Sequence, residues 1–387
     1  MNQEELREVL DKHRLWVDSE EKEGTRADLE RANLGKANLG WANLTEANLR
    51  EARLRDANLE KADLKGAYLE KADLYEANLY KANLRWAELQ WAELSEANLL
   101  DSYLKRADLQ QAFLMYADLV RANLTEANLG GAHLWKANLK GANLEKANLQ
   151  RAELQNSILY KANLKGAILY KANLEIADLR KAELQWADLR EAKLTEADLY
   201  EANLGKANLE GAYLEKADLI EAKLTEADLY EANLREARLI DADLENANLR
   251  YANLERANLK YATLYKVKLE RANLKYATLY KVKLRKANLE NANLENANLE
   301  EADLREADLR WANLRYANLK NADLTGSNLY IADLRWANLK YANLVQSNLS
   351  WADVEEAIFK ETRVCKKNYD YLVGRGVNKE NLILIEE

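Results

Sequence analysis

A leucine at every fifth residue is the feature that most constrains this chain. The leucines begin at Leu29 and recur without insertion or deletion as far as Leu349, and Val354, Phe359 and Val364 continue the same series. An alanine stands two residues before most of these positions, and Asn or Asp usually lies between the two. Internal repetition of this kind sets the fold more firmly than local propensity does.

A five-residue period fits neither a continuous helix nor a continuous strand. On an α-helix each repeat advances about 500°, so successive leucines scatter around the axis. In an unbroken strand an odd period sends alternate leucines to opposite faces. The sequence instead predicts a short extended segment, in which Ala and Leu point inward and Asn or Asp points outward, followed by a two-residue polar corner. With corners near 90°, four repeats close one coil, and residues 27–366 predict about 17 coils.

Repeats such as Ala32-Asn33-Leu34-Gly35-Lys36 and Ala197-Asp198-Leu199-Tyr200-Glu201 resemble the unit Ala-(Asn/Asp)-Leu-x-x of the pentapeptide-repeat protein family. The resemblance covers residues 27–366 and implies an all-β solenoid, a right-handed quadrilateral β-helix. Leucine burial would then contribute on the order of 10 kcal/mol per coil before entropy. We expect the leucines and their substitutes to fill the axis, and representative core positions are Leu29, Leu104, Leu204, Leu284, Leu344 and Phe359.

The two ends of the chain depart from the repeat. Residues 1–18 predict an amphipathic capping helix, with Asn2 as N-cap and Glu5 in the capping-box position, and residues 19–26 predict a solvated linker. Residues 367–387 predict a C-terminal cap or a dimer contact, and we favour the cap. The protein would accordingly be a monomer or a homodimer joined through this tail.

The sequence holds few residues suited to catalysis. The two histidines, His13 and His133, have no partner at metal-ligand spacing, and no phosphate-binding loop or nucleophile elbow occurs. The lone Cys365 cannot form an internal disulfide, and a structural thiol is favoured over a reactive one. We therefore expect no enzymatic activity, no cofactor and no metal. Without a leader-like segment or a long apolar run, we also expect a cytoplasmic location and no membrane contact.

A basic and aromatic stretch over residues 260–286 has two interpretations. Basic side chains interleaved with tyrosines can bind nucleic acid through phosphate contacts and base stacking. Alternatively, residues 20 apart lie one coil above each other and form ladders on the surface. We favour the ladders, which makes a nucleic-acid partner unlikely. The predicted pairs are Arg256 with Tyr276, Lys260 with Tyr280, Tyr265 with Arg285, and Tyr316 with Trp336.

Most tryptophans occupy the second corner position of a repeat, where they should be at least partly exposed. Exposed tryptophans are good interface anchors, although stacking between coils would account for them equally well. The candidate surface contacts are Trp41, Trp86, Trp91, Trp311, Trp336 and Trp351, together with Tyr261 and Tyr280.

Two functions follow from this surface. The first is a rod-like, non-catalytic structural or protein-interaction scaffold whose partner is another protein. The second is implied by the resemblance, because some pentapeptide-repeat proteins mimic DNA and engage DNA gyrase. Duplex DNA carries about one charge per 1.7 Å, so it bears on the order of 45–50 negative charges over the expected length of about 80 Å. The chain has a formal net charge of −8, although residues 191–231 are locally acidic. We therefore favour the scaffold.

Overall fold

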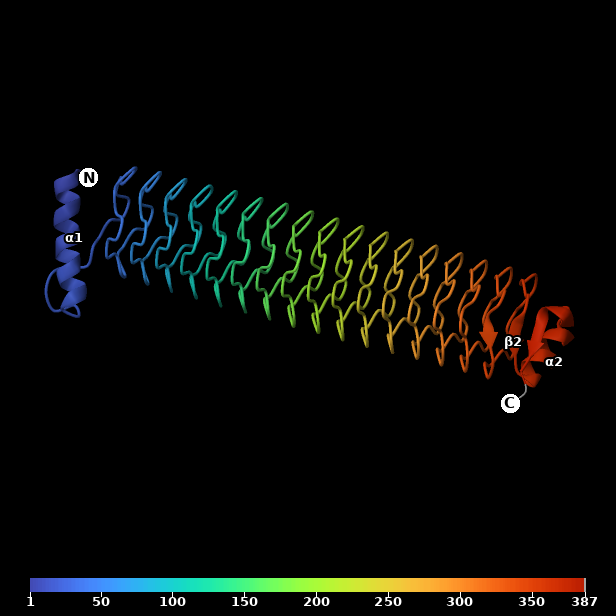
Figure 1. The fold of residues 1–387 in the computed structure, drawn as a ribbon. Coiled ribbons are helices and arrows are strands. Elements are labelled where there is room, and N and C mark those ends of the chain that lie inside the picture. The colour runs from blue at the N-terminus through green and yellow to red at the C-terminus, as the bar shows by residue number, and fades with distance from the viewer. Residues whose placement is uncertain (386–387) are drawn as a thin grey trace. The chain divides into compact units, whose positions relative to one another are not determined.

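The structure, a computed structural model, describes residues 1–385 and contains two compact units, Met1–Lys193 and Leu194–Glu387. In each unit the middle residue of a repeat pairs in parallel with the residue 20 positions later, for example Asp28 with Asn48 and Asp198 with Asp218. Since four repeats separate the paired residues, each coil has four sides. Figure 1 shows these coils stacked side by side within each unit. The 20-residue spacing predicted from the sequence is thus present in both units.

Every backbone N–H of a typical repeat has an acceptor, as the repeat at residues 62–66 shows. The N–H of Ala62 closes the corner on the carbonyl of Leu59 (3.0 Å), and that of Asp63 donates to the previous coil (2.9 Å). Leu64 and Gly66 both donate to the next coil at 2.8 Å. The first corner N–H, of Lys65, donates to Oδ1 of Asp63 at 3.1 Å. Because buried backbone groups must be paired, this pattern explains the recurring Asn or Asp.

The asparagines also form ladders along the sides of the solenoid. In the first unit, Nδ2 of Asn58 donates to Oδ1 of Asn38 at 3.0 Å, and Asn78 and Asn98 continue the series. An equivalent series in the second unit runs through Asn233, Asn253, Asn273, Asn293 and Asn313. Each of these side chains therefore closes a corner and joins two coils.

The extended segments are shorter than the sequence suggested. Most sides contribute a single bridged residue, because two of every five residues belong to a turn. Longer strands occur only at the C-terminal end of the described chain. There β1 (Asn343–Leu344), β2 (Thr362–Val364) and β3 (Leu382–Leu384) form a parallel sheet in the order β1-β2-β3.

The second corner residue adopts a left-handed backbone conformation throughout the repeats. Its φ is 54° at Lys61, 63° at Trp41 and 57° at Ile331, and glycine takes this position in only a minority of repeats. It is the third residue of a four-residue turn closed by a hydrogen bond, where type II turns require positive φ. The sequence analysis did not anticipate this conformation, because Gly and Asn are the residues that adopt it most readily.

The core lies inside the four sides and is made of the predicted leucines and alanines. Leu29, Leu104, Leu204, Leu284 and Leu344 are all fully buried. Phe359 and Val354, in the last coil, are slightly more accessible at 5% and 6%. The axis is therefore filled with side chains in both units.

At the N-terminal end, helix α1 (Gln3–Asp18) lies beside the first coils (Figure 1). Asn2 and Glu5 form a reciprocal capping box, with the N–H of Glu5 donating to Oδ1 of Asn2 at 2.9 Å. His13 is the one fully buried residue of the helix, and its Nδ1 accepts the N–H of Ala27 at 3.0 Å. The first repeat is thus joined directly to the helix.

At the C-terminal end, α2 (Lys366–Gly374) and the 3₁₀ helix η1 (Lys379–Asn381) precede β3. β3 pairs with β2 in the same 20-residue register as the repeats, Thr362 opposite Leu382. Between the two strands a helix replaces three repeats. In the described residues, no helix is long and apolar enough to span a bilayer.

Candidate interaction surface

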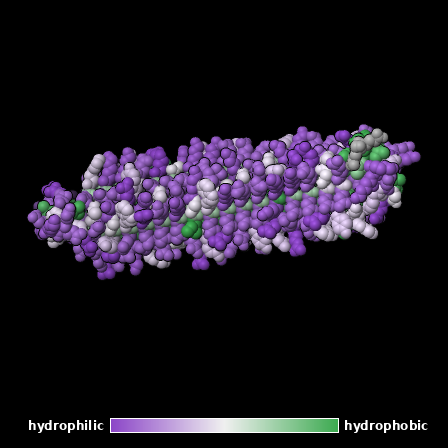
Figure 2. All heavy atoms as spheres, turned by 90° about the horizontal axis from the view of Figure 1, so that it is seen from below, coloured by the Kyte–Doolittle hydropathy of each residue, from purple (hydrophilic) through white to green (hydrophobic). Residues whose placement is uncertain are grey.

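The second corner position projects large side chains away from the axis. Trp41, Trp186 and Trp351 are 71%, 62% and 70% exposed, although the leucines beside them are buried. Figure 2 shows that the surrounding surface is mostly hydrophilic, with few hydrophobic side chains on the face in view. Exposed aromatic groups on such a surface are candidates for contact with another molecule.

Three of these side chains lie above one another in the second unit. The pairing of Asn313 with Asp333, and of Asp333 with Asp353, stacks the repeats at residues 311–315, 331–335 and 351–355. Trp311, Ile331 and Trp351 therefore occupy one corner in successive coils, and all three are exposed. We call these residues, with Tyr316 and Trp336 on the neighbouring corner, the aromatic corner cluster.

Part of the cluster is held in place by ring contacts. Tyr316 stacks on Trp336 with ring centroids 5.0 Å apart and planes 10° apart, as predicted. Trp311 meets Tyr330 edge to face at 6.0 Å, and the guanidinium of Arg315 lies 5.1 Å from the Trp336 ring. These contacts fix the orientation of the rings. Trp336 is half-buried as a result, whereas Trp311 and Trp351 remain exposed.

Charged side chains cover the side between the two corners. The Arg335 guanidinium donates to Asp333 at 2.6 Å and lies 3.4 Å from Asp353. Burial opposes ionisation of Asp333, but hydrogen bonds from Arg335 outweigh it and hold the pKa of Asp333 below its usual value. This side is therefore polar and internally neutralised between two apolar corners.

The other predicted contacts do not gather into one surface. Trp41, Trp86 and Trp91 are exposed on three different corners of the first unit. Tyr261 is exposed, and Tyr280 packs against it edge to face at 5.7 Å. Sequence reasoning missed Ile331 and did not notice that Trp311 and Trp351 are 40 residues apart. Two steps of the 20-residue spacing would have revealed that corner.

Two of the predicted cation–π pairs are wrong. Arg256 lies 5.7 Å from the Tyr276 ring as expected. The cation beside Tyr280 is Lys281, and the one beside Tyr265 is Lys266, each from the same corner. The longer-range contact is lost because adjacent corner residues approach the ring first.

The basic stretch is neutralised by the coil that follows it. Ammonium groups of Lys275 and Lys281 lie 3.1 and 3.2 Å from Glu295 and Glu301. Arg285 donates to Glu306 at 2.6 Å, and this hydrogen bond lowers the pKa of Glu306. Ion pairs between coils, more than cation–π contacts, thus account for this stretch.

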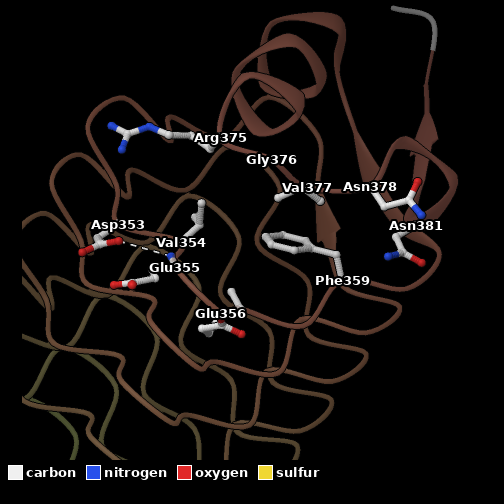
Figure 3. A pocket seen from close by; sticks show the side chains of 11 residues that line it. Asp353, Val354, Glu355, Glu356, Phe359, Arg375, Gly376, Val377, Asn378 and Asn381 are labelled. Carbon is white, nitrogen blue, oxygen red and sulfur yellow. Dashed lines mark hydrogen bonds between the residues drawn. The ribbon is translucent and has the colours of Figure 1, made fainter.

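No reaction centre emerges from the titratable groups. His133 stacks on Phe113 at 5.0 Å, and Cys365 is a buried free thiol at the start of α2. Within residues 1–385, no group of three or more His, Cys, Asp or Glu side chains is arranged to hold a metal ion. The largest chemically mixed cavity lies between the last repeat and the segment after α2 (Figure 3).

These features define a solenoid built from five-residue repeats with four sides per coil. The family model described as pentapeptide repeats (8 copies) matches successive segments between residues 25 and 366, and the chain belongs to this family, whose members fold as right-handed β-helices. No catalytic family is found, and no curated protein matches the chain. The matched segments are 25–60, 52–90, 82–119, 117–156, 157–195, 197–236, 237–275, 252–291, 292–330 and 332–366.

Several solved structures are similar. HetL from Nostoc sp. strain PCC 7120, a pentapeptide repeat protein involved in heterocyst differentiation regulation, is 33% identical over 55% of this chain and 89% of its own, with a TM-score of 0.30. Rfr23 from Cyanothece 51142 is 41% identical over 24% of this chain and 59% of its own (TM-score 0.19). QnrB1, a plasmid-mediated fluoroquinolone resistance protein, is 16% identical over 55% of this chain and 91% of its own (TM-score 0.26).

Proposed function

We propose that the protein is a non-catalytic interaction scaffold and that the aromatic corner cluster contacts a partner protein. The observation that supports this most is the exposure of Trp311, Ile331 and Trp351 on one corner in three successive coils. A bulky or β-branched residue at positive φ is strained, and here it also exposes apolar surface. Neither property stabilises the coil, whereas both suit a binding surface with rigid anchors.

Capture of partners from the source cell tests this proposal. A double variant, Trp311→Ser with Trp351→Ser, should lose a protein that the wild type retains. Ile176→Ser is the matched control, because Ile176 is also exposed at a corner with φ of 58°. Circular dichroism must show that all three proteins are folded. Equal recovery with the double variant would assign the interaction to another surface.

We further propose that the solenoid of about 17 coils is capped at its ends, by α1 at one and by the C-terminal tail at the other. The hydrogen bond between His13 and Ala27 supports the first cap, and the pairing of β3 with β2 supports the second. Covered ends protect strand edges from aggregation.

DNA mimicry receives less support from the surface. In the stretch 191–231, Glu196, Glu215, Asp218 and Glu226 each pair with a lysine or arginine one coil away. A DNA mimic would need unpaired acids along one face. A gyrase supercoiling assay separates the two proposals. Inhibition or protection at micromolar protein would favour mimicry over the scaffold.

A further inference from the structure

The last coil has backbone groups that earlier coils would pair with a following coil, and the C-terminal tail pairs with many of them. β3 covers β2. The buried Asn368 of α2 donates from Nδ2 to the carbonyl oxygen of Ser347 at 3.0 Å. The hydroxyl of Tyr371, also in α2, donates to the carbonyl oxygen of Ala352 at 2.8 Å. The tail thus closes these parts of the terminal edge.

The edge between residues 354 and 359 is different. One coil earlier, the N–H groups of Leu334 and Trp336 donate to the following coil at 2.7 and 3.0 Å. Val354 and Glu356 occupy the equivalent positions, but their N–H groups have no acceptor among residues 1–385. The carbonyl of Ala357 likewise has no donor within the described chain. A short strand edge is therefore unpaired.

A cavity of about 430 Å³ lies against this edge. Figure 3 shows Glu356 and Phe359 on one side of the space, with Arg375 and Val377, from the segment after α2, on the other. The side chains of Val354 and Phe359 are nearly buried and give the cavity an apolar floor. Its volume lies within the range of ligand sites.

The rim of the cavity is acidic. Asp353, Glu355 and Glu356 line it on the repeat side, against Arg375 on the other. Asp353 already interacts with Arg335 at 3.4 Å. Glu355 and Glu356 are exposed and form no ion pair within residues 1–385. The Arg375 guanidinium lies 5.5 Å from the Tyr371 ring. Two carboxylates are thus left to attract a cation.

We propose that this cavity binds an extended, basic segment of another protein by strand addition. The backbone of the segment would accept from the N–H groups of Val354 and Glu356 and donate to the carbonyl of Ala357. A Lys or Arg side chain would meet Glu355 and Glu356, and an apolar side chain would rest on Phe359. Strand addition of this kind takes its affinity from main-chain hydrogen bonds and its specificity from side-chain pockets. The inference deepens the proposed scaffold function by naming one class of partner.

Charge separates this occupant from the alternatives. Nucleic acid would bring phosphates to the carboxylates and be repelled. A second copy of the chain, paired edge to edge, would place Glu355 and Glu356 against identical groups, and like charges disfavour that contact. A basic strand satisfies both the unpaired backbone and the unpaired acids.

The test measures fluorescence anisotropy with the full chain and a fluorescein-labelled hexapeptide of alternating Lys and Val, capped at both ends. We expect saturable binding that Glu356→Lys weakens by about tenfold or more. Glu76→Lys is the matched control, because it makes the same charge change at an equivalent corner with φ of 55°, against 54° at Glu356. A peptide with Glu in place of Lys should not bind, and N-methylation of alternate residues should weaken binding.

Three results would overturn the inference. Equal weakening by both variants would indicate non-specific charge attraction, and unchanged affinity after N-methylation would exclude strand addition. A dimer in light scattering that Glu356→Lys abolishes would assign the edge to a second copy. A partner that still needs Trp351 but ignores the cavity variant would overturn the cavity proposal alone. Loss of the Trp351 effect with peptide binding intact would overturn only the role of the aromatic corner cluster.

Discussion

Asn273 illustrates how much a single polar side chain contributes to this fold. Its Oδ1 accepts the N–H of Lys275 at 3.2 Å and Nδ2 of Asn293 at 3.4 Å, and its own Nδ2 donates to Asn253 at 3.1 Å. It thus fixes a corner and links three coils. Where the middle residue is Tyr or Ile, the repeat lacks this acceptor.

Replacing Asn273 with Ala should therefore destabilise the second unit by roughly 1–3 kcal/mol, since three modest hydrogen bonds are lost. Asn273→Asp should cost less, because a carboxylate still accepts from Lys275 and Asn293 and loses only the donation to Asn253. Urea unfolding of the three proteins measures both effects. If Asp costs as much as Ala, the corner role of the side chain is wrong.

His13 makes the contact between α1 and the repeats sensitive to pH. Burial lowers its pKa, with a further lowering by Arg26, against smaller raising effects from a backbone contact at Thr45 and from Glu46. The folded state therefore prefers neutral imidazole, whose Nδ1 can accept the N–H of Ala27. Its contribution to stability is complete above the ordinary His value of about 6.5 and declines as pH falls below it.

We expect hydrogen-exchange protection of α1 to decrease between about pH 7 and pH 5. His13→Gln should show a smaller dependence on pH, because an amide does not titrate. Parallel curves for the two proteins would place the titrating group elsewhere.

At the scale of elements, the linker after α1 depends on one glycine. Gly24 has φ of +75°, and a Cβ there would lie 2.2 Å from the carbonyl oxygen of Lys12 and 2.8 Å from the nitrogen of Trp16. The following N–H, of Thr25, donates to the same carbonyl at 3.2 Å. The chain passes this close to the helix because no side chain intervenes.

Gly24→Ala should loosen α1 and reduce its hydrogen-exchange protection by the equivalent of about 1–3 kcal/mol. Gly376→Ala is the control, since Gly376 also has positive φ but has no atom within 4 Å of an added Cβ. Equal losses of stability from both changes would attribute the effect to backbone strain rather than to the clash with Lys12.

A coil depends on its axis as α1 depends on Gly24. Leu204 is fully buried, so Leu204→Asp places an uncompensated carboxylate in an apolar environment. We expect a loss of more than about 4 kcal/mol, against less than about 1.5 kcal/mol for Leu204→Met. Thermal melts followed by circular dichroism compare the two. An unaltered melting temperature for Asp would refute the assigned position of the leucine.

The sequence predicted the side chains that face the axis better than it predicted the corners. Leu29 and Leu344 could be placed because a five-residue period leaves one arrangement in which every leucine is buried. The left-handed corners could not, since Lys61 and Trp41 have no preference for positive φ. The aromatic corner cluster needed the spacing between coils, and the cavity at Phe359 arises from the packing of a tail with no repeat to guide prediction.

At the scale of the whole chain, the surface charges pair between coils instead of accumulating. Arg31 meets Glu51 at 2.8 Å in the first unit, and Arg310 meets Glu290 at 2.6 Å in the second. Exposed pairs contribute about 0–1 kcal/mol each and are screened by salt. Acidic and basic stretches of the sequence thus become neutral columns.

Thermal midpoints should consequently change by only a few degrees between about 0.05 and 1 M NaCl, with a slight decrease as pairs are screened. A solenoid with acids stacked on acids would behave in the opposite way, because salt would relieve their repulsion. A marked rise in the midpoint would therefore show that like charges dominate the surface.

The 20-residue register also determines how such a chain can grow by duplication. Copying 20 residues inserts a new turn and returns every side chain to its former column, so ladders and ion pairs find equivalent partners. Copying 15 residues, as in the near-identical segments 257–271 and 272–286, keeps leucine on the axis but rotates the motif by three sides. One length of duplication deepens an existing surface, and the other distributes it around the perimeter.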